Sequence, residues 1–161
     1  MQNRKSRVKL KPMFLAVHAS IGGLIGEKIV TAHQWLAFVL GFLSHFILDM
    51  IPHNDDVTID PINKQSLYLV VASDLLISFF LMLFWLKWLT PQNSHSLILG
   101  MFGAVLPDGI WGIHEQWKIK GFGWFHKMHN YIHRLFSYQI SRKKALLGQI
   151  AIIILVSYFL K

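Results

Sequence analysis

Long apolar runs dominate the pattern of hydrophobic and polar positions along this chain. Five stretches approach the roughly 20 residues that an α-helix needs to cross a bilayer. They are residues 13–30, 33–51, 66–89, 96–113 and 145–160. Turn-forming residues separate them, most clearly at 52–61 and 90–94. The pattern predicts an all-α, polytopic transmembrane helical bundle of four to five spans, with the short fifth run leaving the count open.

The segment between the fourth and fifth runs, residues 114–144, is basic and aromatic instead of continuously apolar. Within it Phe125, Met128, Ile132 and Leu135 recur at helical spacing. This spacing predicts an amphipathic helix that lies in the cytoplasmic interface, with its apolar face towards the acyl chains. The chain has no internal repeat, so residues 1–161 are predicted to form a single membrane domain.

Charge sets the expected orientation of the bundle. The chain has 16 Lys and Arg residues and a formal net charge of +8. If the N-terminus is cytoplasmic, only Lys28, Lys87 and Lys161 are left on the other side, as the positive-inside rule requires. The expected partners are therefore the lipid bilayer and its anionic head groups, and no nucleic acid. The first run carries His18 and Glu27, so we expect a retained helix and not a cleaved signal peptide.

Several ionisable residues lie inside the apolar runs, where each costs about 2.5–3.5 kcal/mol on insertion scales. They are His18, His45, Asp49, Asp74 and Asp108. With a cytoplasmic N-terminus all five fall in the inner half of the membrane. Their common depth predicts a shared site or a shared polar cavity. The chain has no cysteine, so a metal there must be held by His, Asp or Glu.

Spacing adds a second indication of metal binding. His45 and Asp49 are four residues apart and share one helix face. In the interfacial segment His126, His129 and His133 also fall on one face. Neutral imidazole together with carboxylate suits zinc, with manganese or iron as alternatives. A divalent ion lowers the pKa of bound water and polarises a phosphoryl or carbonyl oxygen, which is the basis of hydrolysis.

Structural roles compete with metal binding at each of these positions. A single buried His or Asp in a bundle often serves as a hydrogen-bond partner between helices. Asp74 could bond neighbouring serines, and Asp108, which follows Pro107, could mark a break in its helix. Gly22 and Gly26 in the first run are predicted to allow close helix packing.

Residues 41–52 read Gly-Phe-Leu-Ser-His-Phe-Ile-Leu-Asp-Met-Ile-Pro and resemble the Ser-His-x-x-x-Asp signature of the membrane-bound metal-dependent hydrolases. This is a bacterial inner-membrane family with a LexA-regulated member. His18 resembles the lone His of its first helix, residues 106–108 resemble its Leu-Pro-Asp motif, and His126 with His129 resembles its paired His motif. In this chain the last two motifs follow the Ser-His helix instead of preceding it. The helix is also similar to one in zinc-dependent phospholipases C.

The resemblance implies a metal-dependent hydrolase of the bacterial cytoplasmic (inner) membrane, multi-pass and with a cytoplasmic N-terminus. The expected metal ligands are His18, His45, Asp49, Asp108 and His126. Asp74 and His129 are the expected catalytic groups. A phosphoester or lipid-linked substrate with its head group at the inner surface fits this location. The alternative is a small membrane transporter or assembly protein that uses the buried His and Asp as a polar relay or as helix-packing contacts.

Overall fold

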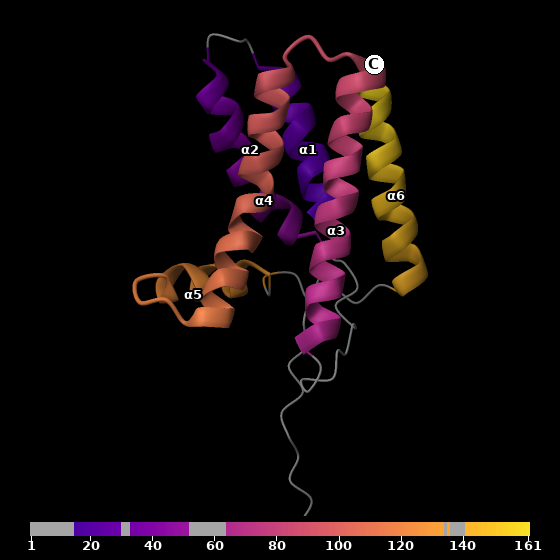
Figure 1. Cartoon of the computed structure of the whole chain (residues 1–161). Helices are drawn as coiled ribbons and strands as arrows, with labels where there is room; N and C mark the ends of the chain where they lie inside the picture. The colour runs from indigo at the N-terminus through magenta and orange to yellow at the C-terminus, as the bar shows by residue number, and fades with distance from the viewer. Residues whose placement is uncertain (1–14, 30–32, 52–63, 134, 136–140) are drawn as a thin grey trace, which may run out of the picture.

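The computed structural model describes residues 15–29, 33–51, 64–133, 135 and 141–161, and these form an all-α fold (Figure 1). Six α-helices and one π-helical segment make up the described chain. They are α1 (Leu15–Glu27), α2 (Gln34–Asp49), α3 (Lys64–Phe84), η2 (Trp85–Leu89), α4 (Ser94–Trp117), α5 (Gly123–Ile132) and α6 (Arg142–Phe159). The predicted all-α class is therefore confirmed.

Five of the helices stand side by side and alternate in direction, whereas α5 lies across the lower end of the bundle in Figure 1. α4 packs against both α1 and α2, and α5 packs against α4 and α2. The start of α1, the end of α2 and the second half of α4 consequently meet near α5. This is the end of the bundle where the polar residues of the apolar runs lie.

Glycines let the backbones of α1, α2 and α4 touch. A Cβ atom built on Gly22 would lie 2.3 Å from the carbonyl oxygen of Gly100, and one built on Gly41 would lie 2.3 Å from the same oxygen. A Cβ on Gly26 would lie 2.0 Å from the carbonyl oxygen of Ser96. Larger residues cannot occupy these positions without moving a helix. The prediction that Gly22 and Gly26 serve close packing is confirmed.

Side chains from neighbouring helices close the opposite end of the bundle. The carboxylate of Glu27, at the end of α1, accepts the backbone N–H groups of Gln92 and Asn93 just before α4, at 2.8 and 3.0 Å. These amides precede the first turn of α4, where a carboxylate is favourable. Trp85 Nε1 donates to Ser157 Oγ at 2.9 Å and thereby joins η2 to α6.

Two of the five predicted spans meet the length and hydropathy of a membrane-crossing helix within the described residues. They are Val71–Leu89 and Ser94–His114. α1 and α2 are apolar but contain only 13 and 16 described residues. The first turn of α6 consists of the charged residues Arg142, Lys143 and Lys144, which shortens its apolar part. The expectation of four to five spans is therefore too high on the length and composition of the described helices, which support two.

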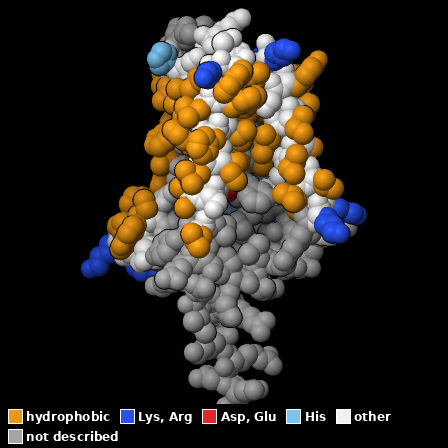
Figure 2. Space-filling view, turned by 45° about the vertical axis from the view of Figure 1, so that its right-hand side comes forward, with side chains coloured by type: hydrophobic (Ala, Val, Ile, Leu, Met, Phe, Trp, Pro, Cys, Tyr) orange, Lys and Arg blue, Asp and Glu red, His pale blue; other side chains and the backbone are white. Residues whose placement is uncertain are grey.

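The outer surface of the bundle is apolar between two charged ends. Figure 2 shows hydrophobic side chains over the flank of the molecule and Lys and Arg side chains near its two ends. Large residues such as Phe80 on α3 and Ile154 on α6 are 63% and 64% exposed. A soluble monomer seldom exposes so much continuous apolar surface.

α5 differs from the predicted interfacial helix in what its apolar face contacts. Phe125 is buried and packs against Phe42 and Phe46 of α2, with ring centroids 6.4 and 6.2 Å away. Trp124 and Tyr131 lie on the exposed face. The prediction that the face carrying Phe125 turns to the acyl chains is wrong, because α2 provides an aromatic surface for it. The buried face of α5 also carries His129.

Candidate metal centre

Six imidazole and carboxylate side chains from four helices converge near the lower end of the bundle. They are His18 of α1, His45 and Asp49 of α2, Asp108 of α4, His129 of α5 and His133, which directly follows α5. Four of them are almost fully buried. Only the side chains of Asp108 and His133 keep appreciable exposure, at 27% and 10%. The cluster is therefore internal but reaches the surface on one side.

Asp49 lies at the middle of the cluster and contacts all four imidazoles. Its Oδ1 lies 3.4 Å from His18 Nε2. Its Oδ2 lies 3.1 Å from His45 Nε2, 3.5 Å from His129 Nε2 and 3.1 Å from His133 Nε2. The helical spacing of His45 and Asp49 thus brings both groups to one point, as their sequence positions predict.

Asp108 approaches the same imidazoles from α4. Its Oδ1 lies 3.6 Å from His45 Nε2 and 3.3 Å from His129 Nε2. These two nitrogens lie 3.1 Å from each other, and the rings of His18 and His45 stack with centroids 4.2 Å apart. The Nε2 atoms of His45 and His129 therefore face both carboxylates. Those of His18 and His133 face Asp49.

A backbone carbonyl selects the tautomer of the neutral His45 ring. Its Nδ1 lies 2.8 Å from the carbonyl oxygen of Ala104 on α4. A carbonyl oxygen can only accept, so Nδ1 donates, and the neutral ring then presents a lone pair at Nε2. Metal-ligating histidines are held by this kind of contact at the other ring nitrogen. His45 is therefore oriented as a ligand towards the cluster.

Buried polar atoms in the cluster make no hydrogen bond within the described part of the chain. They include both ring nitrogens of His18 and both carboxylate oxygens of Asp49. An unsatisfied buried polar group costs about 1–3 kcal/mol, and more when it is charged. A cation bonded to several of these atoms would remove that cost. Ligands bonded to one ion at about 2.1 Å lie roughly 3.0–3.4 Å apart, close to the separations of this cluster.

The structure brings together five residues that the sequence singles out: His18, His45, Asp49, Asp108 and His129. It does not bring in His126, which was expected as a metal ligand. The ring of His126 stacks on Trp111 of α4, with centroids 5.9 Å apart and an interplanar angle of 9°. Its nitrogens face the side-chain amide of Asn130, the closer one at 3.2 Å. His126 thus joins α5 to α4 beside the cluster.

Asp74 of α3 is expected as a catalytic group, but its side chain lies beside the first residues of α1. Its carboxylate accepts the backbone N–H groups of Leu15 and Ala16, the latter at 3.2 Å. The N-terminal amides of a helix have no acceptor within the helix, so a carboxylate there satisfies them. Asp74 therefore holds α1 in place three residues before His18, and no contact within the described residues joins it to the cluster's imidazoles.

His133 is the cluster member that the list of expected ligands omits. It is four residues after His129, so its ring lies on the same face and one turn further along, with ring centroids 4.7 Å apart. The spacing of His126, His129 and His133 in the sequence already places His133 on the same helix face as His129. The resemblance to a paired His motif favoured His126 with His129, whereas the pair that contacts Asp49 is His129 with His133.

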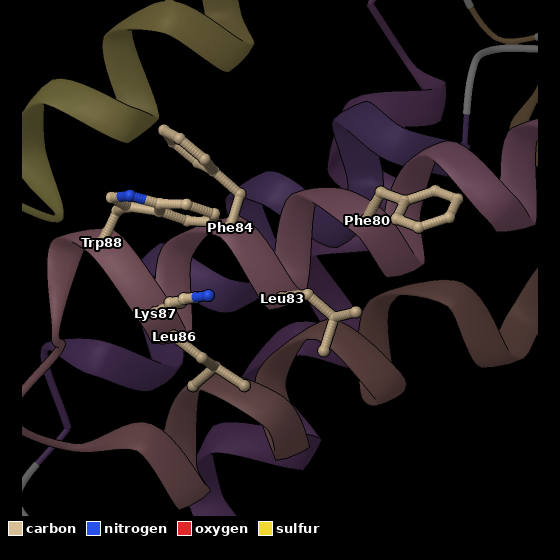
Figure 3. A pocket seen from close by; sticks show the side chains of 6 residues that line it. All are labelled: Phe80, Leu83, Phe84, Leu86, Lys87 and Trp88. Atoms are coloured by element: carbon tan, nitrogen blue, oxygen red, sulfur yellow. The ribbon is translucent and has the colours of Figure 1, made fainter.

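A surface hollow of about 520 Å³ lies away from the cluster, on η2 and the end of α3 (Figure 3). Apolar side chains and Lys87 line it, and Phe84 stacks on Trp88 with centroids 5.5 Å apart. It offers no carboxylate and no imidazole. The imidazoles and carboxylates that could hold a metal therefore lie in the buried cluster and not along this hollow.

Comparisons with known proteins assign no family to this chain. No family model, no curated protein and no solved structure matches the chain. The buried His and Asp cluster that could hold a metal is thus what supports the resemblance of residues 41–52 to the membrane-bound metal-dependent hydrolases.

Proposed function

We propose that this protein is a membrane-embedded, metal-dependent hydrolase that acts at the cytoplasmic membrane surface. One observation carries the proposal: four imidazoles and two carboxylates from four helices converge inside an apolar bundle. Ionisable groups are expensive in such a place, so they are retained where they have a function. The ligands would be His18, His45, Asp49, Asp108, His129 and His133, with zinc as the first candidate and manganese or iron as alternatives.

The apolar flank of the bundle supports a membrane location. We place Val71–Leu89 and Ser94–His114 across the bilayer. In this proposal α6 crosses beside them, and α1 and α2 complete the bundle. Exposed Lys118, Lys120 and Lys127 then lie near the end that holds the cluster, on the cytoplasmic side. The host membrane in this proposal is a bacterial inner membrane, and the N-terminus is cytoplasmic.

The substrate class follows from the exposed edge of the cluster. Asp108 and His133 are its two partly exposed members, so a substrate would approach between α4 and the end of α5. A bound divalent ion would supply Lewis acidity towards a phosphoryl oxygen and a source of nucleophilic water. Cationic side chains at this end would favour an anionic head group. A phosphoester, free or lipid-linked, is the substrate class that fits.

The non-enzymatic alternative is a transporter or an assembly protein. A transport path needs polar groups through the whole thickness of the membrane, whereas this cluster lies at one end of the bundle. An assembly protein could use the same residues to hold its helices together, without hydrolysis. Metal content and turnover, measured on the same preparation, separate these functions.

The test is metal loading and hydrolysis by protein purified in detergent. After chelation and reloading with zinc or manganese, we expect at least one ion per chain by elemental analysis and hydrolysis of bis(p-nitrophenyl) phosphate or of a lipid phosphate. His45→Ala should lose most of the metal and reduce hydrolysis by about 100-fold or more, since even altering a residue that hydrogen-bonds a metal ligand costs about 10–100-fold. His95→Ala removes an exposed imidazole from the other end of α4 and is the matched control.

Two outcomes would contradict the proposal. Less than about 0.1 ion per chain in the wild type would remove the metal centre, because a site built for hydrolysis must hold its ion. Full metal content without hydrolysis of any phosphoester tested would favour the assembly alternative.

A further inference from the structure

The donor atoms of the cluster are arranged as three overlapping triads. They are His18 with His45 and Asp108, His45 with Asp49 and His129, and Asp108 with His129 and His133. Within each triad the donor atoms lie within 4.8 Å of one another. His45, Asp108 and His129 belong to two triads each. His18, Asp49 and His133 belong to one triad each, His18 to the first, Asp49 to the middle one and His133 to the last. The cluster is thus elongated, with one imidazole pair at either end.

The two oxygens of Asp49 face different ends of this elongated cluster. Oδ1 lies beside His18 at one end, and Oδ2 lies beside His129 and His133 at the other. Oδ2 also lies 3.1 Å from Nε2 of His45, so this oxygen faces the middle of the cluster as well. A carboxylate that serves one ion with one oxygen and a second ion with the other is a bridging ligand. The orientation of Asp49 is that of such a bridge.

Asp108 also lies between the two ends. Its Oδ1 is 3.6 Å from His45 and 3.3 Å from His129, one imidazole from each pair. The cluster therefore consists of His18 and His45 at one end, His129 and His133 at the other, and two carboxylates in the middle.

A single ion would use this set poorly. A catalytic zinc site has three protein ligands and keeps one position open, whereas six protein ligands would fill the coordination sphere of one ion and exclude substrate. Two ions that share the carboxylates would each have two imidazoles and two carboxylate oxygens. Each would then keep room for a further ligand, as two-metal hydrolytic sites with ions about 3.5–4 Å apart do.

We propose that the cluster is a dinuclear centre, with one divalent cation on His18 and His45, the other on His129 and His133, and both bridged by Asp49 and Asp108. This inference rests on the proposed metal-dependent function and adds its stoichiometry and its bridging groups. Two divalent cations against two carboxylates give the centre a net charge of +2, which favours an anionic phosphoester over a neutral ester. The second ion would also fix the end of α5 to the other three helices.

The test counts ions and detects their coupling in the full-length protein in detergent. Loaded with manganese, the wild type should hold about two ions per chain, with the exchange-coupled electron paramagnetic resonance spectrum of a carboxylate-bridged pair. His133→Ala and His18→Ala should each lower the content to about one ion and convert the spectrum to that of isolated manganese. His95→Ala should keep both ions and the coupled spectrum.

The wild-type measurement alone decides the inference, even where a variant fails to fold. One ion per chain with an uncoupled spectrum would overturn the dinuclear centre and leave the proposed hydrolase standing. No bound ion would overturn both. Two ions without coupling would also contradict the shared carboxylates, because ions bridged by Asp49 must interact.

Discussion

The carboxylate of Asp74 lies where two amides of α1 have no helical acceptor. Replacing it by Ala should lower the free energy of unfolding by about 1 kcal/mol, the usual effect of losing a side-chain cap at a helix N-terminus. Metal content should stay unchanged, since Asp74 does not contact the cluster's imidazoles. Thermal unfolding in detergent and elemental analysis of one preparation measure both quantities.

Asp49→Ala is the comparison for this substitution, because it removes a carboxylate that contacts all four imidazoles. It should abolish metal binding. If Asp74→Ala lost its metal while its unfolding temperature stayed the same, Asp74 would belong to the metal centre and not to the start of α1.

The expected depth of residues in the membrane and their spacing along the chain are sufficient to locate most of the cluster. They do not separate Asp74 from it. His18, His45, Asp49 and Asp108 share a depth and converge as expected. Asp74 has the same depth, yet its partners are backbone amides 58 and 59 residues earlier in the chain. Backbone donors have no sequence signature, so a carboxylate that caps a distant helix looks like a ligand.

At the scale of helices, the contact between α1 and α4 depends on Gly100. A Cβ atom there would lie 2.0 Å from the carbonyl oxygen of Gly22. Gly100→Ala should therefore push α1 away from α4 and cost about 1–3 kcal/mol, as overpacking typically does. It should also weaken metal binding, since His18 and Asp108 are held by these two helices. Unfolding temperature and the dissociation constant for zinc are the measurements.

Gly112→Ala is the matched control on the same helix, where a built Cβ meets nothing within 4 Å. Ala has the higher helix propensity, so this control should be neutral or slightly stabilising. Equal effects of the two substitutions would show that helix propensity, and not the close contact of α1 with α4, determines the result.

The helix α5 shows what periodicity can and cannot establish. The recurrence of Phe125, Met128 and Ile132 predicted a helix with one apolar face, and the helix is present. Periodicity does not distinguish a lipid surface from a protein surface, because both are apolar. Phe42 and Phe46 of α2 cover Phe125, and the same contact carries His129 into the cluster.

At the scale of the whole molecule, the described helices lie where the spans are expected, but most of them are shorter or less hydropathic than a span requires. Helices lie within all five apolar runs, yet two of them reach the length and hydropathy of a span. α1 and α2 are apolar, but their 13 and 16 described residues are fewer than the roughly 20 that a span needs.

The absence of cysteine in the chain allows a direct test of its orientation. Single cysteines at exposed Gln92, Lys144 and Lys161 would mark the turn before α4 and the two ends of α6. In intact cells a membrane-impermeant maleimide should label Gln92→Cys and Lys161→Cys and spare Lys144→Cys, because the positive-inside rule retains the basic end inside. Lys144→Cys should react fully after permeabilisation. If Lys144→Cys and Lys161→Cys were both spared, α6 would not cross the membrane. If Lys144→Cys were labelled and Gln92→Cys spared, the metal centre would face outwards and its substrate would have to be sought on that side.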